Sequence, residues 1–211
     1  MDKYHIFIDM KELRKRLFID RKTSAKERYE IINLAVENEC DTLVFSLDDK
    51  FFKSKNRNLK YIKLIKQYNL FIEAGGRDLS FLLPGRMFFF HRELFRMEQG
   101  KRKKKYHFCP TNPKTRYIIV KRAKYLFARS MQSVTVPRIF HLLPDEGHEN
   151  TWCACPACRA FSPDEQYIIA VNSAADALAG LDPDARLSFF DYGTVRETER
   201  ILPRENMFHL V

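Results

Sequence analysis

The sequence predicts an α/β fold of the (β/α) barrel type: a partial TIM barrel with five or six parallel strands and an inserted β-hairpin. Short apolar runs alternate along the chain with segments in which apolar residues recur at helical spacing, an order typical of a parallel sheet covered by helices. No glycine-rich loop follows any of these runs, which argues against a dinucleotide-binding or P-loop fold. The chain has 211 residues, whereas a full barrel needs about 250. We therefore expect a partial barrel that forms a single domain over residues 1–211.

Composition restricts the class of protein. The hydrophobic fraction of 45% and the 18 phenylalanines argue against disorder. No apolar run approaches the roughly 20 residues that span a bilayer, so no membrane partner is expected. The opening segment MDKYHIFIDMKELRKR is too charged for a signal peptide, which predicts a cytoplasmic protein.

Strands and helices are expected to alternate from the first residues onward. The first helix starts at a capping box, in which Ser24 and Glu27 reciprocally satisfy free backbone amides. The second helix has one apolar face, made of Leu59, Ile62, Ile65 and Tyr68. Six apolar runs are expected to form the strands, at residues 5–8, 42–46, 70–74, 138–142, 187–190 and 207–211.

Two further helices have clear end signals. Asn112 and Pro113 suit the cap and the first position of the third helix. Ser162 and Glu165 form a second capping box at the start of the fourth helix, and Gly180 ends it. Each helix is thus expected between two of the predicted strands.

A long excursion interrupts this alternation at about residues 77–113. Residues 87–90 and 105–108 flank a turn at Gln99 and Gly100, and they are expected to pair as a hairpin. The run Lys101–Lys105 lies beside that turn. We interpret it as a solvated turn that also protects a sheet edge.

Charge is distributed unevenly along the chain. Residues 1–135 carry 31 Lys and Arg against 15 Asp and Glu, while residues 136–211 carry 6 against 12. A basic half can attract nucleic acid. The chain shows no aromatic-interleaved single-strand motif and no helix-turn-helix signature, so a nucleic-acid partner is the less favoured interpretation of this charge.

Acidic residues follow several of the predicted strands, where a parallel β/α fold places its active site. Asp145 and Glu146 follow the fourth strand. Two carboxylates near one another can act as an acid and a base, which glycoside hydrolysis requires. We expect Glu146 to donate the proton and Asp145 to orient the substrate or stabilise positive charge; the alternative is that Asp145 only caps a turn. The other candidates are Asp191 as a further catalytic acid, and Glu73, Arg77, Trp152 and Tyr192 as substrate-binding residues.

Four of the five cysteines suggest a metal site. Cys153, Cys155 and Cys158 lie within six residues, and Cys109 precedes the third helix. Four thiolates form the closed tetrahedral shell of a structural zinc site, so zinc is expected here as a structural and not a catalytic ion. Three alternatives stay open: reduced cysteines without metal, a disulfide among them, and His148 as the fourth ligand. Cys40 is expected to be buried as a small apolar residue.

The segment from residue 108 to residue 192 resembles the uncharacterised bacterial domain family DUF4838. The resemblance implies a TIM-barrel domain of the kind attached to carbohydrate-active proteins, and therefore a link to glycan hydrolysis by analogy. The Asp-Glu pair at the fourth strand is also similar to that of β-hexosaminidases, in which the acetamido group of the substrate acts as the nucleophile. The shared elements are Cys109–Pro113, Asp145, Cys153–Cys158, Asn172 and Tyr192-Gly193.

These observations leave three functional hypotheses. The first is a glycoside-hydrolase-like barrel domain that binds or cleaves a carbohydrate. The second is a non-enzymatic binding or assembly module held together by a metal, which forms a homodimer through an open sheet edge. The third is a nucleic-acid binder that uses the basic half of the chain.

Overall fold

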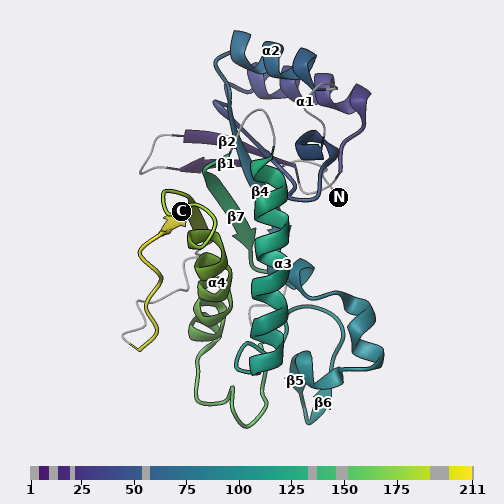
Figure 1. Ribbon diagram of the computed structural model, residues 1–211, viewed down its shortest axis with the longest axis vertical. Coiled ribbons are helices and arrows are strands. Elements are labelled where there is room, and N and C mark those ends of the chain that lie inside the picture. Colours follow the sequence, from purple (N-terminus) through teal and green to yellow (C-terminus); the bar gives the residue numbers. More distant parts are fainter. Residues whose placement is uncertain are drawn as a thin grey trace. The chain divides into compact units, whose positions relative to one another are not determined.

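The computed structural model describes residues 5–9, 14–19, 22–53, 58–132, 137–145, 152–190 and 200–210 (Figure 1). Its main helices are α1 (Ala25–Glu37), α2 (Leu59–Gln67), α3 (Pro113–Met131) and α4 (Pro163–Ala179). Its strands are β1 (His5–Asp9), β2 (Arg14–Ile19), β3 (Thr42–Phe45), β4 (Phe71–Asp78), β5 (Met97–Glu98), β6 (Lys101–Arg102), β7 (Ile139–Leu143), β8 (Arg186–Phe190) and β9 (Met207–Leu210).

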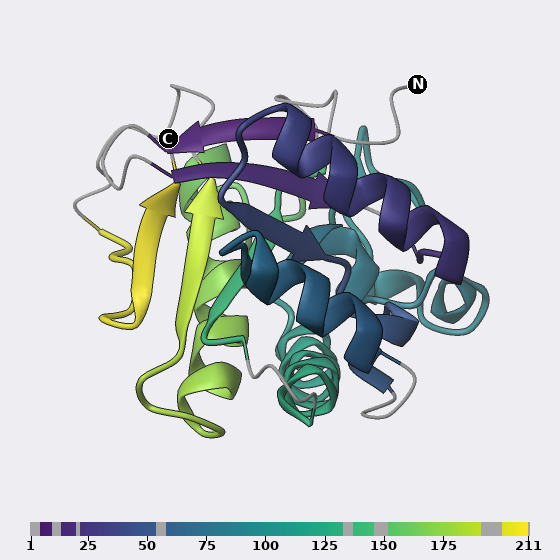
Figure 2. The same cartoon turned by 90° about the horizontal axis from the view of Figure 1, so that it is seen from above.

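The main sheet has seven strands in the order β1-β2-β3-β4-β7-β8-β9. β2, β3 and β4 pair in parallel, and β8 and β9 lie side by side and point in the same direction (Figure 2). Six strands, β2, β3, β4, β7, β8 and β9, form the parallel sheet of a partial (β/α) barrel. The fold class predicted from the alternation of apolar runs is therefore confirmed.

The first strand differs from the prediction. β1 forms where expected but pairs antiparallel with β2, and Asp9 lies opposite Arg14, the first residue of β2. Asp9 is therefore not at the carboxyl end of a parallel strand. The first parallel strand is β2, which the sequence did not reveal because its first three residues, Arg14-Lys15-Arg16, are all charged.

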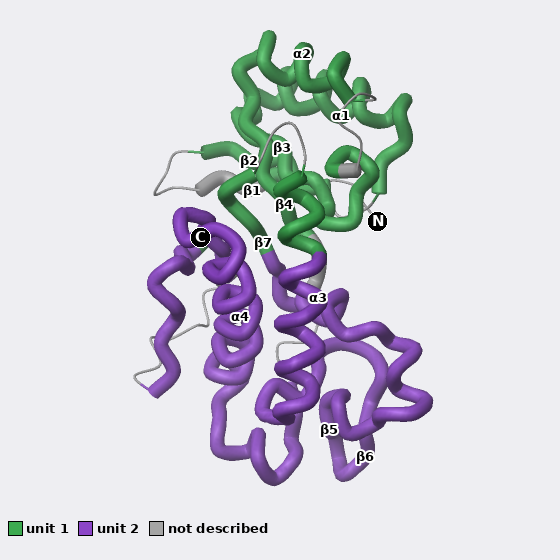
Figure 3. Tube along the Cα trace, in the orientation of Figure 1, with its two compact units in different colours: residues 1–77, 126–141, 210–211 green, residues 78–125, 142–209 purple. Residues whose placement is uncertain are grey.

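The chain separates into two compact units, whose boundaries fall within β4, α3, β7 and β9 (Figure 3). Unit 1 comprises residues 1–77, 126–141 and 210–211, and unit 2 comprises residues 78–125 and 142–209. Each is described by itself below.

In unit 1, α1 and α2 lie side by side (Figures 1 and 2). The predicted capping box starts α1: Ser24 accepts a hydrogen bond from the amide of Glu27, whose side chain accepts one from the amide of Ser24. Tyr61 of α2 donates a hydrogen bond of 2.7 Å to the carbonyl of Ala25 at the start of α1. The core beneath is apolar and fully buried at Leu17 and Leu43.

In unit 2, α3 and α4 start as the sequence predicts. Asn112 accepts hydrogen bonds from the amides of Lys114 and Thr115, and the capping box of Ser162 and Glu165 is present at α4. α4 then packs against β8, and Gly180 forms its C-cap. Among the helices within the described ranges, none is both long and apolar enough to cross a bilayer.

The excursion does contain a hairpin, but not between the segments that the sequence predicts. Residues Gly85–Phe89 form a short 3₁₀ helix, η3. The hairpin turns at Gln99 and Gly100 as expected, between the two-residue strands β5 and β6. Phe108 pairs with Phe95 through an isolated bridge. Two positive φ angles, 47° at Gln99 and 75° at Gly100, make the turn tighter than the wide hairpin that we expected.

Candidate functional site

Four cysteines from two loops of unit 2 converge on one point. Cys109 lies between the hairpin and α3, and the other three lie in the loop between β7 and α4. All four are buried, and their sulfur atoms lie within 4.8 Å of one another. The predicted meeting of Cys109 with Cys153, Cys155 and Cys158 is therefore confirmed.

The spacing of the sulfur atoms suits a tetrahedral ion. The sulfur of Cys109 lies 3.7 Å from that of Cys155 and 3.6 Å from that of Cys158. Zinc–sulfur bonds of about 2.3 Å in a tetrahedron separate neighbouring sulfurs by about 3.8 Å. A disulfide holds them about 2.0 Å apart, so these cysteines are not bridged, and all are free thiols. The group can hold a metal ion.

Several donors point at these sulfur atoms. The amide of Met97 donates to the sulfur of Cys153 over 3.3 Å, and the guanidinium of Arg102 lies 3.8 Å from the same sulfur. The hydroxyl of Thr111 lies 3.1 Å from the sulfur of Cys158. Such contacts stabilise thiolate charge and orient metal ligands. The sequence did not predict that any of these three residues contacts the cluster; the nearness of Thr111 to Cys109 in the chain was the one available signal.

The acid-base chemistry of the cluster also favours a cation. Hydrogen bonds from the thiols of Cys153 and Cys158 hold the pKa of Cys109 well below its usual range. Hydrogen bonding to Cys109 in turn raises the pKa of Cys153 to about 11 and also raises the pKa of Cys158. Four thiols this close cannot all ionise unless a positive charge balances them, and a divalent ion supplies that charge.

Asp145 lies just past the end of β7 and joins three parts of unit 2. Its carboxylate accepts hydrogen bonds from the hydroxyl and the amide of Ser80 and from the amide of His107. The imidazole Nδ1 of His107 lies 3.0 Å from the same carboxylate, although its orientation does not make a hydrogen bond. Asp145 is 6% exposed. Its carboxylate therefore fastens the excursion to the end of β7.

Trp152 belongs to the same cluster as Asp145. Its ring stacks on the imidazole of His107, with the ring centroids 3.8 Å apart and the planes 14° from parallel. Tyr167 of α4 lies 6.1 Å away at a tilt. One face of the indole is thus occupied by a protein ring, and Trp152 helps to hold the loop that carries the cysteines.

In unit 1, Glu73 of β4 lies in a buried charge network. Its carboxylate accepts a hydrogen bond of 2.8 Å from Arg16 of β2 and lies 2.6 Å from the imidazole of His141 of β7. Burial raises the pKa of Glu73, but the contacts with His141 and Arg16 outweigh it and lower the pKa to about 2. Gly75 permits the approach, because a Cβ there would collide with the backbone of His141. Neither Arg16 nor His141 was predicted.

The remaining predicted site residues cannot be placed. Glu146, Asp191 and Tyr192, and the alternative ligand His148, lie outside the described residues. Arg77 lies in β4, and its side chain is likewise outside the description. Their proposed roles stay predictions.

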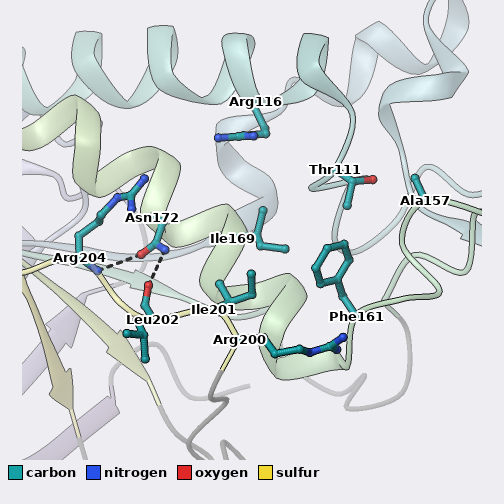
Figure 4. Close-up of a pocket in the computed structure, with 10 residues that line it drawn as sticks. All are labelled: Thr111, Arg116, Ala157, Phe161, Ile169, Asn172, Arg200, Ile201, Leu202 and Arg204. Atoms are coloured by element: carbon teal, nitrogen blue, oxygen red, sulfur yellow. Dashed lines mark hydrogen bonds between the residues drawn. The ribbon is translucent and has the colours of Figure 1, made fainter.

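Unit 2 also contains a cavity of about 540 Å³ with a mixed basic and apolar lining (Figure 4). Two of its three arginines are neutralised by carboxylates: Arg200 pairs with Glu165 and Arg204 with Asp176. Asn172, noted in the family resemblance, donates to the carbonyl of Leu202 and accepts from the amide of Arg204. Its role is to tie the segment from residue 200 to 204 onto α4. The lining residues are Thr111, Arg116, Ala157, Phe161, Ile169, Asn172, Arg200, Ile201, Leu202 and Arg204.

Comparison with solved structures shows what this fold resembles. The chain is similar to a structure of the GH20 catalytic modules in a pneumococcal exo-β-D-N-acetylglucosaminidase, with a TM-score of 0.56 and 11% sequence identity over 91% of this chain and 57% of that one. An exo-β-1,4-mannosidase from Opitutaceae bacterium strain TAV5 aligns with a TM-score of 0.42 and 14% identity over 78% of this chain and 27% of that one.

The first comparison shows that the chain shares the (β/α)-barrel fold of that structure. It spans just over half the length of that structure, 57%. No family model and no curated protein matches the chain, so membership of DUF4838 stays a prediction.

Proposed function

We propose that this chain is a glycoside-hydrolase-like barrel domain that binds or hydrolyses a glycan, and that a structural zinc ion fastens its loops. One observation carries the proposal. The loops that follow β4 and β7 are joined in unit 2 by the carboxylate of Asp145 and by the four cysteines. Loops at the carboxyl ends of parallel strands form the substrate site of barrel enzymes.

Zinc is the ion that these residues suit best. The ligand set is four sulfurs, which favours zinc over the oxygen-preferring magnesium and calcium. Four protein ligands leave no open position for water or substrate, and catalysis at zinc needs one. We therefore assign the ion a structural role, which the donors from Met97 and Thr111 support.

The candidate catalytic residues have separate tasks in this proposal. Glu146 donates the proton to the leaving group, with Asp191 as the second acid. Asp145 positions the loop from which Glu146 extends, since its own carboxylate is occupied by Ser80 and His107. Trp152 and Tyr192 are proposed to line the glycan site. Glu73 is 2% exposed and is occupied by Arg16 and His141, so it does not line that site. A hexosaminidase-like reaction is the form of hydrolysis that we propose.

A panel of aryl glycosides, including N-acetyl-hexosaminides, tests the enzymatic form of the proposal. We expect Glu146→Gln to lower turnover by about 100-fold or more, because loss of a general acid removes 10²–10⁴ in rate. Glu30→Gln on the exposed side of α1 is the control. Equal turnover by the wild type and Glu146→Gln would remove Glu146 from the mechanism.

The second candidate function is a non-enzymatic binding or assembly module. It is favoured by the contacts of two predicted site carboxylates. Glu73 is paired with Arg16 and His141, and Asp145 accepts hydrogen bonds from Ser80 and His107. β1 and β9 are the edge strands of the sheet, and either can pair with a second copy. Sedimentation velocity at several concentrations tests this form, and a monomer throughout would contradict the homodimer.

Two further expectations remain part of the proposal. Membership of DUF4838 is supported by the spacing of the cysteines, Asp145 and Asn172. Cytoplasmic localisation is supported by the use of cysteine as free thiols. Cell fractionation with an antibody to the chain checks the second of these.

A further inference from the structure

The excursion of unit 2 exposes two adjacent phenylalanines. Phe89 ends the helix η3 with 69% of its surface exposed, and Phe90, the next residue, is 85% exposed. Phenylalanine has no polar atom to hydrogen-bond water, so an exposed pair of rings favours a ligand with an apolar face.

A basic side chain borders one of these rings. The ammonium of Lys104 lies 4.9 Å from the ring centroid of Phe89, and Lys104 also lies against Gly85. These two contacts place the segment after the hairpin beside η3, although some 15 residues separate them in the chain. We define the basic aromatic surface as Arg86, Phe89, Phe90, Lys103, Lys104 and Lys105, of which the three lysines, Arg86 and both rings are all exposed.

The positive charge of this surface is not balanced nearby. Residues 85–105 carry eight Lys and Arg against two Glu. Of these acids, Glu98 pairs with Arg96, and Glu93 lies near His91 and Lys114. Within the part of the chain that the structure describes, no carboxylate pairs with the basic residues of the surface.

The base of the excursion is held by the cysteine cluster. Arg102 donates to the carbonyl of Phe95 over 2.6 Å and also approaches the sulfur of Cys153. The amide of Lys103 donates to the carbonyl of Arg96, and the guanidinium of Arg96 donates to the carbonyl of Lys105. The surface is therefore fixed before a ligand arrives, which reduces the entropy lost on binding.

We infer that the basic aromatic surface binds an acidic polysaccharide, whose carboxylate or sulfate groups pair with the lysines while the apolar faces of its sugar rings pack on Phe89 and Phe90. This inference rests on the proposed function and names the substrate class for it. The excursion follows the carboxyl end of β4, the side on which barrels bind their substrates. In this inference, a polymer bound at the proposed glycan site also contacts the basic aromatic surface.

Single-stranded nucleic acid is the competing ligand, because it also combines phosphate charge with rings that stack on aromatic side chains. The position of the surface after a barrel strand favours the glycan. The oligonucleotide is therefore one arm of the test.

Binding of dextran sulfate and of unmodified dextran to the full chain tests the inference, since the two polymers differ in charge alone. We expect dextran sulfate to bind, to weaken as salt is raised, and to exceed dextran by at least about tenfold. Replacing Lys103, Lys104 and Lys105 together by Gln should weaken binding about tenfold, since each exposed ion pair is worth a few-fold. Phe90→Ala should weaken it several-fold.

Matched controls come from the exposed face of α3. The pair Lys121→Gln and Lys124→Gln removes exposed charge, and Tyr125→Ala removes a ring that is 64% exposed. Neither control should change binding. Equal loss in the controls, or no loss in the lysine variant, would overturn the inference.

The remaining outcomes separate this inference from the proposed function. Tighter binding of a single-stranded oligonucleotide than of dextran sulfate, through the same residues, would overturn the inference in favour of nucleic acid. Binding of neutral glycans without any preference for dextran sulfate would overturn it and leave the proposed function intact. Dextran sulfate binding that is lost in the lysine variant supports the inference even when no aryl glycoside is turned over.

Discussion

The two units hold their functional residues in different ways. In unit 1, Glu73 is placed by secondary structure: it lies on β4, and its partners Arg16 and His141 lie on β2 and β7. In unit 2, the cysteines and Asp145 lie in loops, and it is their own contacts that bring those loops together. Strand pairing sets the geometry of the first group, whereas side-chain chemistry sets the geometry of the second.

The two units therefore depend on different interactions for their order. The excursion of unit 2 contains only two-residue strands and 3₁₀ turns, so backbone pairing contributes little to its order. The cluster of four cysteines and one buried carboxylate replace that pairing. We therefore expect damage to the cysteines to loosen the loops first, and damage to Glu73 to weaken the folded strands as a whole.

The largest effect is expected from Cys158→Ser. Loss of one of four ligands should lower zinc affinity by at least about 100-fold, since even outer-shell changes cost 10–100-fold. The excursion should then become sensitive to protease between residues 85 and 105, and metal analysis with limited proteolysis measures both effects. Cys40→Ser is the control, because Cys40 is buried outside the cluster. Full metal content in Cys158→Ser would contradict the site.

Glu73→Gln should produce the next largest effect. It removes the charge of the carboxylate that pairs with the buried guanidinium of Arg16, and breaking a buried pair costs about 3–5 kcal/mol. Urea unfolding measures the change in the free energy of unfolding. Glu30→Gln should change it by less than about 0.5 kcal/mol, since the ion pair of Glu30 with Lys26 is exposed. Equal stability of the two variants would show that the network contributes nothing.

Acid should weaken unit 1 through the same residue. The pKa of Glu73 is lowered from 4.5 to about 2 in the folded protein. Its contribution to stability is therefore complete above pH 4.5 and is lost as the pH falls toward about 2, by about 3 kcal/mol. Unfolding curves between pH 5 and about 2 should show this slope, and Glu73→Gln should flatten it. An unchanged slope in the variant would assign the acid sensitivity to other groups.

Asp145→Asn should have the smallest effect of the four. The asparagine keeps one oxygen that can accept from Ser80 or from His107, but it loses the negative charge. Its NH₂ group would replace the other oxygen and point at a hydrogen-bond donor. This mismatch costs about 1–3 kcal/mol. Thermal unfolding, compared with Asp184→Asn at an exposed position, measures this. A cost as large as that of Glu73→Gln would mean that Asp145 matters more for folding than the buried charge network does.

Local signals in the sequence predicted most of the elements. Both capping boxes start their helices as expected, because the cap and its partner are three residues apart and need no tertiary context. β2 was missed because Arg16 is charged and yet completely buried. Its burial depends on Glu73, 57 residues away in the chain, which no local pattern reveals.

The same reasoning explains which site residues were found. The cysteine set was predicted from two features of the sequence. Three cysteines lie within six residues, and the odd total of five favours thiols or metal ligands over a set of disulfides. The partners of Asp145 were missed because Ser80 and His107 are 65 and 38 residues away in the chain. Neither residue lies in a sequence motif that indicates such a contact. Trp152 was predicted to face a sugar, and stacking on His107 is a contact that only the fold could bring about.

The central claim is that four cysteines from two loops share one structural zinc ion. X-ray absorption at the zinc edge on the purified native protein, combined with metal analysis, tests it most directly. We predict one zinc ion per chain with four sulfur neighbours at about 2.3 Å. A protein purified without chelators that holds no metal, or a shell in which oxygen or nitrogen replaces sulfur, would contradict it.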